Sequence, residues 1–437
     1  MSRIIVAGAG HGGLTAAFNL AKAGHSVTVY EKESYETVGH DWHDGLWLRD
    51  FDLVNMPRPD ASLLTPNKDM RFFNPKKTVT LELNFPESSN SVFIDRRKLV
   101  QFLLDQCVSA GVEVQYNTRV LGAVCGPDRI RGIKIRTHNG DTKTVFGDLV
   151  IDAAGVSSPV RRSLPGRFGI QNEIPAEDIF FVYRAYYEKT DPEKLDPRYS
   201  VYFFHCGHAG MDWMITEEDY MDVLVGKFGG ITQEEIEESL ADFREEYPCL
   251  GSAVKRGGYI SKIPLTRTLP CIVANGYAAV GDSAGMTVPL NGCGINLSLQ
   301  AGGTLALIAR SVKDGNYTKE KLWPYQQRYC VLHGNRLVII AKLRAFLATL
   351  KAHNVDFLME SGILSQTEIG MANGNMSAVN FGYVMQKLRA ILPQSYLIPA
   401  TISAMRGIRN LKKITTRMPA IYDEAKISSW LKIYNGI

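Results

Sequence analysis

A glycine-rich turn near the N-terminus constrains the fold of this 437-residue chain more than any other feature. Apolar residues 4–6 lead into Gly8, Gly10 and Gly13, and a second apolar run ends in Glu31. The first glycine permits a tight strand-to-helix turn, the second lets the backbone approach a diphosphate, and the third lets the helix pack on the strand. The acid can accept hydrogen bonds from ribose hydroxyls. This pattern predicts a Rossmann-like dinucleotide-binding unit.

A second motif near residue 280 indicates which dinucleotide is bound. Asp282 follows an apolar run and precedes Pro289, Gly292 and Gly294, which open an uncharged, helix-like stretch. Such an acid can hold a polyol chain, and the amides of a helix N-terminus can face an anionic ring edge. The layout fits the ribityl chain and the N1/C2 carbonyl region of FAD. Taken alone, it would also suit a buried strand followed by a helix-capping aspartate.

With Arg97, Leu99 and Leu103, these motifs resemble the flavoprotein superfamily typified by p-hydroxybenzoate hydroxylase, and within it the geranylgeranyl reductase family. The resemblance runs from residue 3 to about residue 330. It implies FAD as the cofactor. The cofactor-binding residues that we predict are Gly8, Gly10, Gly13, Glu31, Lys32, Arg97, Gly155, Gly281, Asp282, Pro289, Gly292, Gly294 and Ile295.

The fold class that this resemblance implies is α/β, with a Rossmann-like FAD-binding domain of the p-hydroxybenzoate hydroxylase type. An antiparallel β-sheet substrate domain is inserted into it, and a helical C-terminal region follows. The expected bounds are 1–175 and 258–330 for the FAD-binding domain, with a β-hairpin layer at 112–144, then 176–257 for the substrate-binding sheet and 331–437 for the helical region.

Two departures from the family patterns leave the reaction open. Ala154 and Gly155 stand where related hydroxylases carry an Asp-Gly pair, which weakens a typical monooxygenase assignment. Residues 211–216 match a reductase motif only in part, and Trp213 with Ile215 match a halogenase motif as well. We expect an FAD-dependent oxidoreductase that reduces a carbon–carbon double bond of a lipophilic or isoprenoid substrate. The alternatives are a monooxygenase or halogenase-like enzyme acting on an aromatic or polyene substrate, and an electron-transfer flavoprotein serving a quinone or protein partner.

Candidate catalytic residues are His40, His43 and Cys293. The superfamily brings the loop after the second strand close to the isoalloxazine, where an imidazole could donate a proton near neutral pH. The two histidines could equally belong to a hydrogen-bonded surface loop. Cys293 is expected at a helix N-terminus, where the pKa of a thiol is lowered, or serves only as a small residue beside the ring.

Candidate substrate-binding residues are Trp42, Trp213 and Arg267, although Arg267 would also fit an ordinary surface salt bridge. We expect no metal site and no disulfide framework, because the seven cysteines include no C-x-x-C pair. The N-terminus leads straight into a strand, so no signal peptide is expected and a cytoplasmic location is favoured. No second glycine-rich nucleotide domain is visible, so NAD(P)H or ferredoxin would act as a transient electron donor.

The C-terminal tail carries the strongest signal for a partner. Residues 381–437 hold nine Lys or Arg against two acids, a net charge of +7, interleaved with apolar residues. Such a segment can lie peripherally on an anionic membrane, where each Lys or Arg contributes roughly 1 kcal/mol, and residues 336–351 could extend that surface. Alternatively, its helices pack on the core or on a second subunit, and the oligomeric state stays open. We expect no nucleic-acid binding, because basic and aromatic residues are not interleaved as such binding requires.

Overall fold

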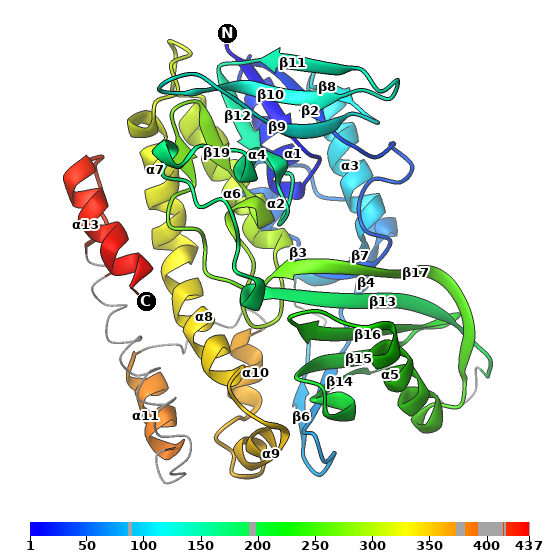
Figure 1. Cartoon of the computed structure of the whole chain (residues 1–437). Helices are drawn as coiled ribbons and strands as arrows, with labels where there is room; N and C mark the ends of the chain where they lie inside the picture. Colours follow the sequence, from blue (N-terminus) through cyan, green and yellow to red (C-terminus); the bar gives the residue numbers. More distant parts are fainter. Residues whose placement is uncertain (86–89, 192–197, 373–380, 392–413, 415–416, 437) are drawn as a thin grey trace.

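The computed structural model describes residues 1–85, 90–191, 198–372, 381–391, 414 and 417–436. In Figure 1 a mainly parallel sheet lies at the top, a long antiparallel sheet lies at the lower right, and the C-terminal helices run down the left side. A cavity between these three parts holds the candidate site.

The N-terminal part contains a six-stranded sheet of order β18-β19-β12-β1-β2-β8. Its pairings are parallel except for that between β18 and β19. Buried apolar side chains cover both of its faces, as parallel sheets require. The strands are β1 (Arg3–Ala7), β2 (Ser26–Tyr30), β8 (Glu113–Gln115), β12 (Leu149–Asp152), β18 (Val273–Ala274) and β19 (Tyr277–Ala279).

Helices place the two cofactor motifs side by side. Helix α1 (His11–Lys22), which follows the first glycine motif, packs against both α3 (Arg96–Ser109) and α6 (Ile295–Ala309). Asp95 caps α3 by accepting hydrogen bonds from the backbone amides of Arg97 at 2.8 Å and Lys98 at 3.2 Å. Because α6 follows the second motif, the contact between α1 and α6 brings the two distant sequence motifs together.

An antiparallel layer of three strands covers the first sheet, but its predicted bounds of 112–144 are wrong. The layer contains β9 (Arg119–Cys125), β10 (Ile130–Arg136) and β11 (Thr142–Phe146). Residues 113–115 instead pair with β2 in parallel and form the edge of the main sheet. Their short apolar-polar alternation does not distinguish an edge strand from a hairpin strand.

The second sheet has seven strands in the order β17-β13-β16-β15-β14-β5-β6. Residues 176–257 supply only part of it, because β5 and β6 come from the part predicted to belong to the FAD-binding domain and β17 continues beyond residue 257. The strands are β5 (Met70–Phe73), β6 (Thr80–Leu83), β13 (Ile179–Lys189), β14 (Tyr199–Phe203), β15 (Gly210–Thr216), β16 (Tyr220–Phe228) and β17 (Leu250–Pro264). Helix α5 (Gln233–Glu246) packs on this sheet and begins with a Thr232–Glu235 capping box.

Smaller elements connect the two large sheets. A three-stranded antiparallel sheet is formed by β3 (His43–Trp47), β4 (Leu64–Pro66) and β7 (Ser91–Asp95). The short helix α2 (Arg49–Leu53) packs on α6, and α4 (Pro159–Arg162) packs on β9. Strand β3 contains the candidate His43, so this small sheet fixes the loop in which the candidate histidines lie.

The C-terminal helices contact both large sheets. Helix α7 (Lys319–Tyr329) continues through the π-turn η6 (Cys330–Gly334) into α8 (Asn335–Leu347) and runs from the first sheet toward the second (Figure 1). The others are α9 (Ala352–Glu360), α10 (Gln366–Ala372), α11 (Phe381–Ile391) and α13 (Glu424–Asn435). Within the described segments, no helix is both long enough and apolar enough to cross a membrane.

The end of the tail packs on the core. Trp430 and Tyr434 of α13 are 1% and 2% exposed. The indole N–H of Trp430 donates to the backbone oxygen of Ile414 at 3.1 Å, and the Tyr434 hydroxyl donates to that of Thr268 at 2.6 Å. These aromatic side chains are therefore not free to enter a membrane. The basic stretch 392–413 lies outside the described residues.

The stretch 336–351 also differs from its prediction. Leu337, Ile340 and Leu350 are buried, while Leu343 and Leu347 face the cavity. The apolar face of this helix is therefore used inside the molecule, and the prediction that it extends a membrane surface is wrong.

Candidate functional site

One cavity of about 740 Å³ connects the two cofactor motifs with the seven-stranded sheet and the C-terminal helices. Its polar end contains His11, Arg96 and Asp282, and its apolar end is walled by side chains from β5, β14, α8, α9 and α10. The position of the cavity makes it the candidate active site.

The first glycine motif is folded as the sequence predicts. Gly8 has a φ of +89°, and a Cβ atom there would lie 2.8 Å from the backbone oxygen of Ala153. Gly13 faces the same residue, because its Cβ atom would come within 2.5 Å of the Ala153 Cβ. A Cβ atom at Gly10 would also lie 2.8 Å from the backbone oxygen of Ala153, so only glycine permits this close approach of turn, helix and strand.

Glu31 lies directly beneath this turn. Its carboxylate accepts hydrogen bonds from the backbone amides of Ala9 at 2.8 Å and Glu33 at 3.0 Å, and the residue is 7% exposed. These bonds fix the orientation of the carboxylate at the end of β2, where the motif requires a ribose acceptor. Lys32 is exposed, pairs with Glu33 at 3.3 Å and does not line the cavity.

The second motif forms the 3-10 turn η5 (Gly281–Ala284) and leads into α6. Asp282, Gly292 and Gly294 line the cavity, as does Ile295, while Pro289 is buried behind it. Burial raises the pKa of Asp282, although the charge of Arg96 opposes this effect. No side chain caps α6 at Gly294, so its first amides remain available to a ligand.

A buried polar network that the sequence reasoning missed holds this second motif. Arg161 is fully buried and donates to the backbone oxygen of Ser283 at 2.6 Å. The Ser283 hydroxyl accepts a hydrogen bond from the Gly155 amide at 2.9 Å. Asp152, also fully buried, accepts from Ser158 at 2.6 Å and anchors the turn that contains Gly155. Gly155 therefore lies next to the predicted FAD motif through a bond that sequence spacing does not reveal.

Arg96, and not the predicted Arg97, faces the cavity. The Arg97 side chain turns to Asp41, with 3.4 Å between nitrogen and oxygen, and it does not line the cavity. Arg96 does line it and pairs with Asp44 at 3.2 Å. The sequence could have identified Arg96. When the family pattern Arg-x-x-Phe-Asp-x-x-Leu is aligned on Leu99 and Leu103, its arginine falls at residue 96.

His40 lies in the cavity wall and not on an outer surface loop. Its ring stacks on Trp42 with 4.4 Å between centroids, and its Nδ1 lies 3.2 Å from the Tyr259 hydroxyl. Burial, with the charge of Arg96, lowers the pKa of His40 well below its ordinary value. The ring is therefore neutral at neutral pH.

His43 is held by three groups. Its backbone amide donates to the Tyr186 hydroxyl at 2.7 Å, its Nδ1 lies 3.0 Å from the Tyr220 hydroxyl, and its Nε2 lies 3.8 Å from the Asp95 carboxylate. Burial and the charge of Arg256 lower its pKa below 6.5, whereas Asp95 opposes them. His43 thus faces the cavity as a neutral imidazole near pH 7 and becomes a relatively strong acid when protonated.

A buried arginine joins this loop to the long sheet. Arg184 of β13 donates to Asp222 at 2.9 Å, to Asp44 at 3.0 Å and to the backbone oxygen of His43 at 2.7 Å. Burial opposes its charge, but Asp222 and Asp44 hold the pKa of Arg184 well above its ordinary value. This side chain fixes the position of His43 relative to the sheet.

The two tryptophans predicted to contact substrate come together around Arg184. The guanidinium carbon lies 5.7 Å from the Trp42 ring centroid and 5.3 Å from the Trp213 ring centroid. Both rings line the cavity, and among the described residues neither buried indole N–H has a hydrogen-bond partner. Each can therefore donate to a ligand.

Arg267 does not enter the cavity. Its guanidinium donates to the backbone oxygen of Tyr434 at 2.5 Å and lies 4.6 Å from the centroid of that ring. Neither the predicted substrate contact nor a surface salt bridge describes it. Arg267 anchors α13, a role that depends on a contact across 167 residues of sequence.

Cys293 lines the cavity and is exposed toward it. The prediction of a lowered thiol pKa is wrong: although the side chain is open to the cavity, the protein that surrounds the cavity and the charge of Asp44 raise the pKa of Cys293 to about 12. The thiol stays protonated near neutral pH.

The apolar end of the cavity suits a hydrocarbon chain. It is walled by side chains of the long sheet and the C-terminal helices, including Phe72, Val201, Phe346, Leu358, Leu364 and Ile369. These residues belong to two buried clusters that meet at Leu364. An apolar ligand entering from the polar end would therefore be enclosed between the sheet and the helices.

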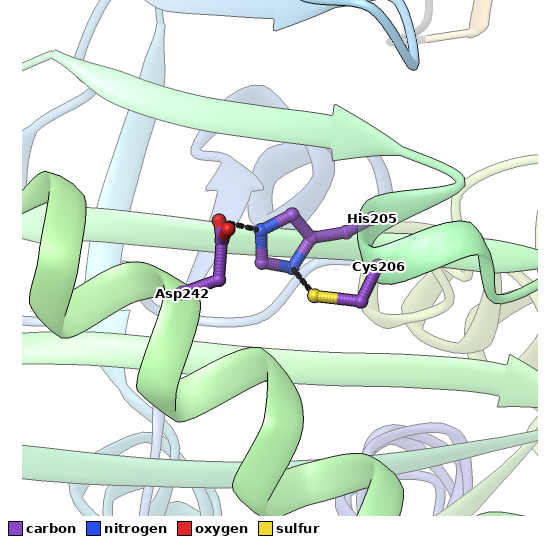
Figure 2. A group of neighbouring side chains, drawn as sticks. All are labelled: His205, Cys206 and Asp242. Carbon is purple, nitrogen blue, oxygen red and sulfur yellow. Dashed lines mark hydrogen bonds and ion pairs between the residues drawn. The ribbon is translucent and has the colours of Figure 1, made fainter.

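A separate cluster near α5, formed by His205, Cys206 and Asp242, has ligand atoms within 4.8 Å of one another. His205 lies between two carboxylates, 2.8 Å from Asp212 on the Nδ1 side and 2.8 Å from Asp242 on the Nε2 side. Figure 2 shows Asp242 and Cys206 at opposite edges of the His205 ring. Both ring nitrogens of His205 are thus paired with carboxylates. The cluster acts as a bridge between η4 (His205–Gly207) and α5.

The residues of the polar end fit FAD. The Glu31 carboxylate and the open glycine turn suit a ribose and a diphosphate, and the free amides before α6 with Asp282 suit the ribityl chain and the ring edge. Two further donors for an anionic ligand at this end are His11 Nε2 and Arg96 Nε, which have no partner within the part of the chain that the structure describes.

Comparisons with known proteins agree with this geometry. A family model described as FAD dependent oxidoreductase matches residues 3–158. A digeranylgeranylglycerophospholipid reductase from Sulfolobus acidocaldarius is 21% identical over 448 residues, covering 99% of this chain and 96% of the relative. The solved structure of a geranylgeranyl bacteriochlorophyll reductase-like protein from Thermoplasma acidophilum has a TM-score of 0.74 at 21% identity, covering 93% of this chain and 99% of that one.

The fold is shared more widely. The myxobacterial chondrochloren halogenase has a TM-score of 0.60 at 17% identity, covering 93% of this chain and 97% of that one. At such identity the likeness shows the fold alone. The motifs, the site and the comparisons together define the class: this chain is an FAD-dependent oxidoreductase with a Rossmann-like FAD-binding fold. Within that class, the chain is similar over most of its length to digeranylgeranylglycerophospholipid reductases, which agrees with the resemblance of its motifs to the geranylgeranyl reductase family.

Proposed function

We propose that this protein reduces carbon–carbon double bonds in the isoprenoid chain of a lipid. The observation that carries the proposal is the continuity of the cavity, because Asp282 and Gly294 line one end and Phe346 and Leu358 line the other. An extended apolar chain bound there would bring its double bonds to the polar end. The relatives named digeranylgeranylglycerophospholipid reductase support the choice of an isoprenoid lipid.

Binding of the chain would come from the apolar end, which the seven-stranded sheet and the C-terminal helices enclose. Burying one methylene group contributes about 0.8 kcal/mol, so a five-carbon isoprenoid unit contributes roughly 4 kcal/mol of transfer free energy. The same enclosure excludes water from the reacting bond. The long sheet therefore acts as the substrate-binding domain in this proposal.

The cofactor would be held by Glu31, the Gly8–Gly13 turn, Arg96, Asp282 and the N-terminus of α6. Reduced FAD, when bound, supplies a hydride to one carbon of the double bond. The second carbon needs a proton from the protein or from water.

We infer that His43 delivers this proton. Its ring lines the cavity, and its lowered pKa makes the protonated ring a stronger acid than an ordinary histidine. The Asp95 carboxylate, 3.8 Å from Nε2, favours the protonated ring, and the Tyr220 hydroxyl, 3.0 Å from Nδ1, fixes its orientation. His40 is less suited, because its pKa is lowered so far that its ring rarely carries the proton to be donated near neutral pH. Cys293 is also less suited, because a thiol with a pKa of about 12 releases its proton poorly.

Electrons would reach the cofactor from NAD(P)H or ferredoxin as a transient donor. The lipophilic substrate would be collected at a membrane surface, which fits the excess of basic residues after residue 381. A cytoplasmic protein that binds the membrane peripherally would have access both to the electron donor and to the lipid.

A product assay tests the proposal. The protein is incubated anaerobically with a reducing agent and a polyisoprenoid lipid, and the expected product is heavier by two hydrogens for each reduced bond. Leu364→Trp should block the apolar end and abolish this product while FAD remains bound. Leu53→Trp, at a position that is 67% exposed, is the matched control and should keep full activity. An oxygenated product formed only in air would replace the proposal with monooxygenation.

A further inference from the structure

An unpartnered histidine stands at the start of α1. His11 is the first residue of this 12-residue helix and lies inside the glycine motif, between Gly10 and Gly12. The residue is 8% exposed and lines the cavity, yet among the described residues its Nε2 atom has no hydrogen-bond partner. A buried polar atom that lacks a partner destabilises the protein unless a ligand supplies one.

The surroundings of His11 favour an anion as that ligand. The residue before the helix is Gly10, which provides no side-chain cap, so the first amides of α1 are open to a ligand. The Nε atom of Arg96 is also buried without a partner among the described residues, and Arg96 lines the same cavity. Its charge lies close enough to affect the titration of His11. Donors from two side chains and a helix N-terminus thus converge on one region.

We propose that His11 binds the diphosphate of FAD, with its Nε2–H donating a hydrogen bond to a phosphate oxygen. A neutral imidazole has one N–H donor, and burial keeps the ring neutral because it lowers the pKa of His11 to about 3. The ring therefore adds a donor without adding a charge beside Arg96. This role completes the glycine motif with a side chain that the spacing of its glycines does not specify.

The inference rests on FAD binding and not on the proposed reduction. A binding titration can therefore test it without any turnover, and a different reaction at the site would leave the result unchanged.

The experiment compares three ligands of the apoprotein: FAD, ADP, which has the diphosphate without the flavin, and riboflavin, which has the flavin without the diphosphate. His11→Ala should weaken FAD and ADP binding by the same factor, about 10- to 100-fold for one hydrogen bond to a charged group. Its affinity for riboflavin should not change. His11→Gln should recover most of the loss, because its side-chain amide also carries an N–H donor.

His25→Ala is the matched control, since His25 lies after the other end of α1 and bonds to the backbone amide of Ser2 at 3.3 Å. It should leave all three affinities unchanged. Three results would overturn the proposal. These are full affinity of His11→Ala for FAD, a loss confined to riboflavin, and an equal loss for all three ligands with a lowered melting temperature, which would indicate a packing role.

Discussion

Substitution of Arg184 by methionine should destabilise the protein strongly. Arg184 and Asp222 are 3% and 2% exposed in their side chains, and the guanidinium makes two hydrogen bonds to this carboxylate. Methionine leaves the Asp222 charge buried and unpaired. Removing one partner of a buried ion pair costs about 3–5 kcal/mol of unfolding free energy.

The structure also predicts how the loss can be reversed. Asp44, which shares Arg184, is 28% exposed and keeps its contact with Arg96 at 3.2 Å, so it adds little to the loss. Replacing Asp222 with leucine in the Arg184→Met background removes the buried charge. The double variant should therefore regain more than half of the stability, because apolar pairs of similar volume often substitute well for buried ion pairs.

Urea denaturation followed by tryptophan fluorescence at pH 7 measures both changes in the unfolding free energy. Lys262→Met is the control for removing a cation from the same cavity, since among the described residues this lysine has only a ring contact, 5.2 Å from the Phe181 centroid. A loss below about 1 kcal/mol in Arg184→Met, or a double variant no more stable than the single one, would refute the assignment of a buried charge pair.

Three further predictions concern other parts of the chain. Asp282→Ala should lower FAD affinity by about 10- to 100-fold with the fold intact, because a charged acceptor is lost; equal affinity in an equilibrium titration would exclude a contact with the cofactor. Burial lowers the pKa of His205, but Asp212 and Asp242 raise it above 6.5 overall, so its stabilising effect is complete below pH 6.5 and is lost as the pH rises through the folded-state value. His205→Gln should remove that part of the pH dependence of the unfolding free energy, and an unchanged profile would contradict it. Trp430→Ala should reduce the unfolding free energy by about 3–5 kcal/mol, because α13 packs on the core; an unchanged denaturation midpoint would show that the helix is dispensable.

The FAD-binding part of the fold could be predicted because its signals are local. The turn at Gly8 and the acid at Glu31 are fixed by strand, turn and helix geometry within about thirty residues. The same holds for Asp282 and its glycines. The prediction of Arg97 was wrong by one residue, because counting back from Leu99 and Leu103 along the helix identifies Arg96.

The features that could not be predicted depend on contacts between distant residues. Strand β5 joins the long sheet only because β14, more than a hundred residues later, pairs with it in parallel. Arg267 turns to Tyr434, and no sequence pattern relates these two positions. The pKa of Cys293 is raised by burial and by the charge of Asp44, which is distant in the sequence. The membrane surface proposed for the tail stays a prediction, because residues 392–413 are outside the described structure.

Flavin reoxidation under anaerobic conditions tests the central claim most directly. The flavin is first reduced chemically, then mixed with a polyisoprenoid lipid or with its fully saturated counterpart, and the flavin absorbance is followed. Reduction of carbon–carbon double bonds predicts that the unsaturated lipid reoxidises the flavin and the saturated lipid does not. If neither lipid reoxidises the flavin, while oxygen does so rapidly through a transient hydroperoxide spectrum, the account is contradicted.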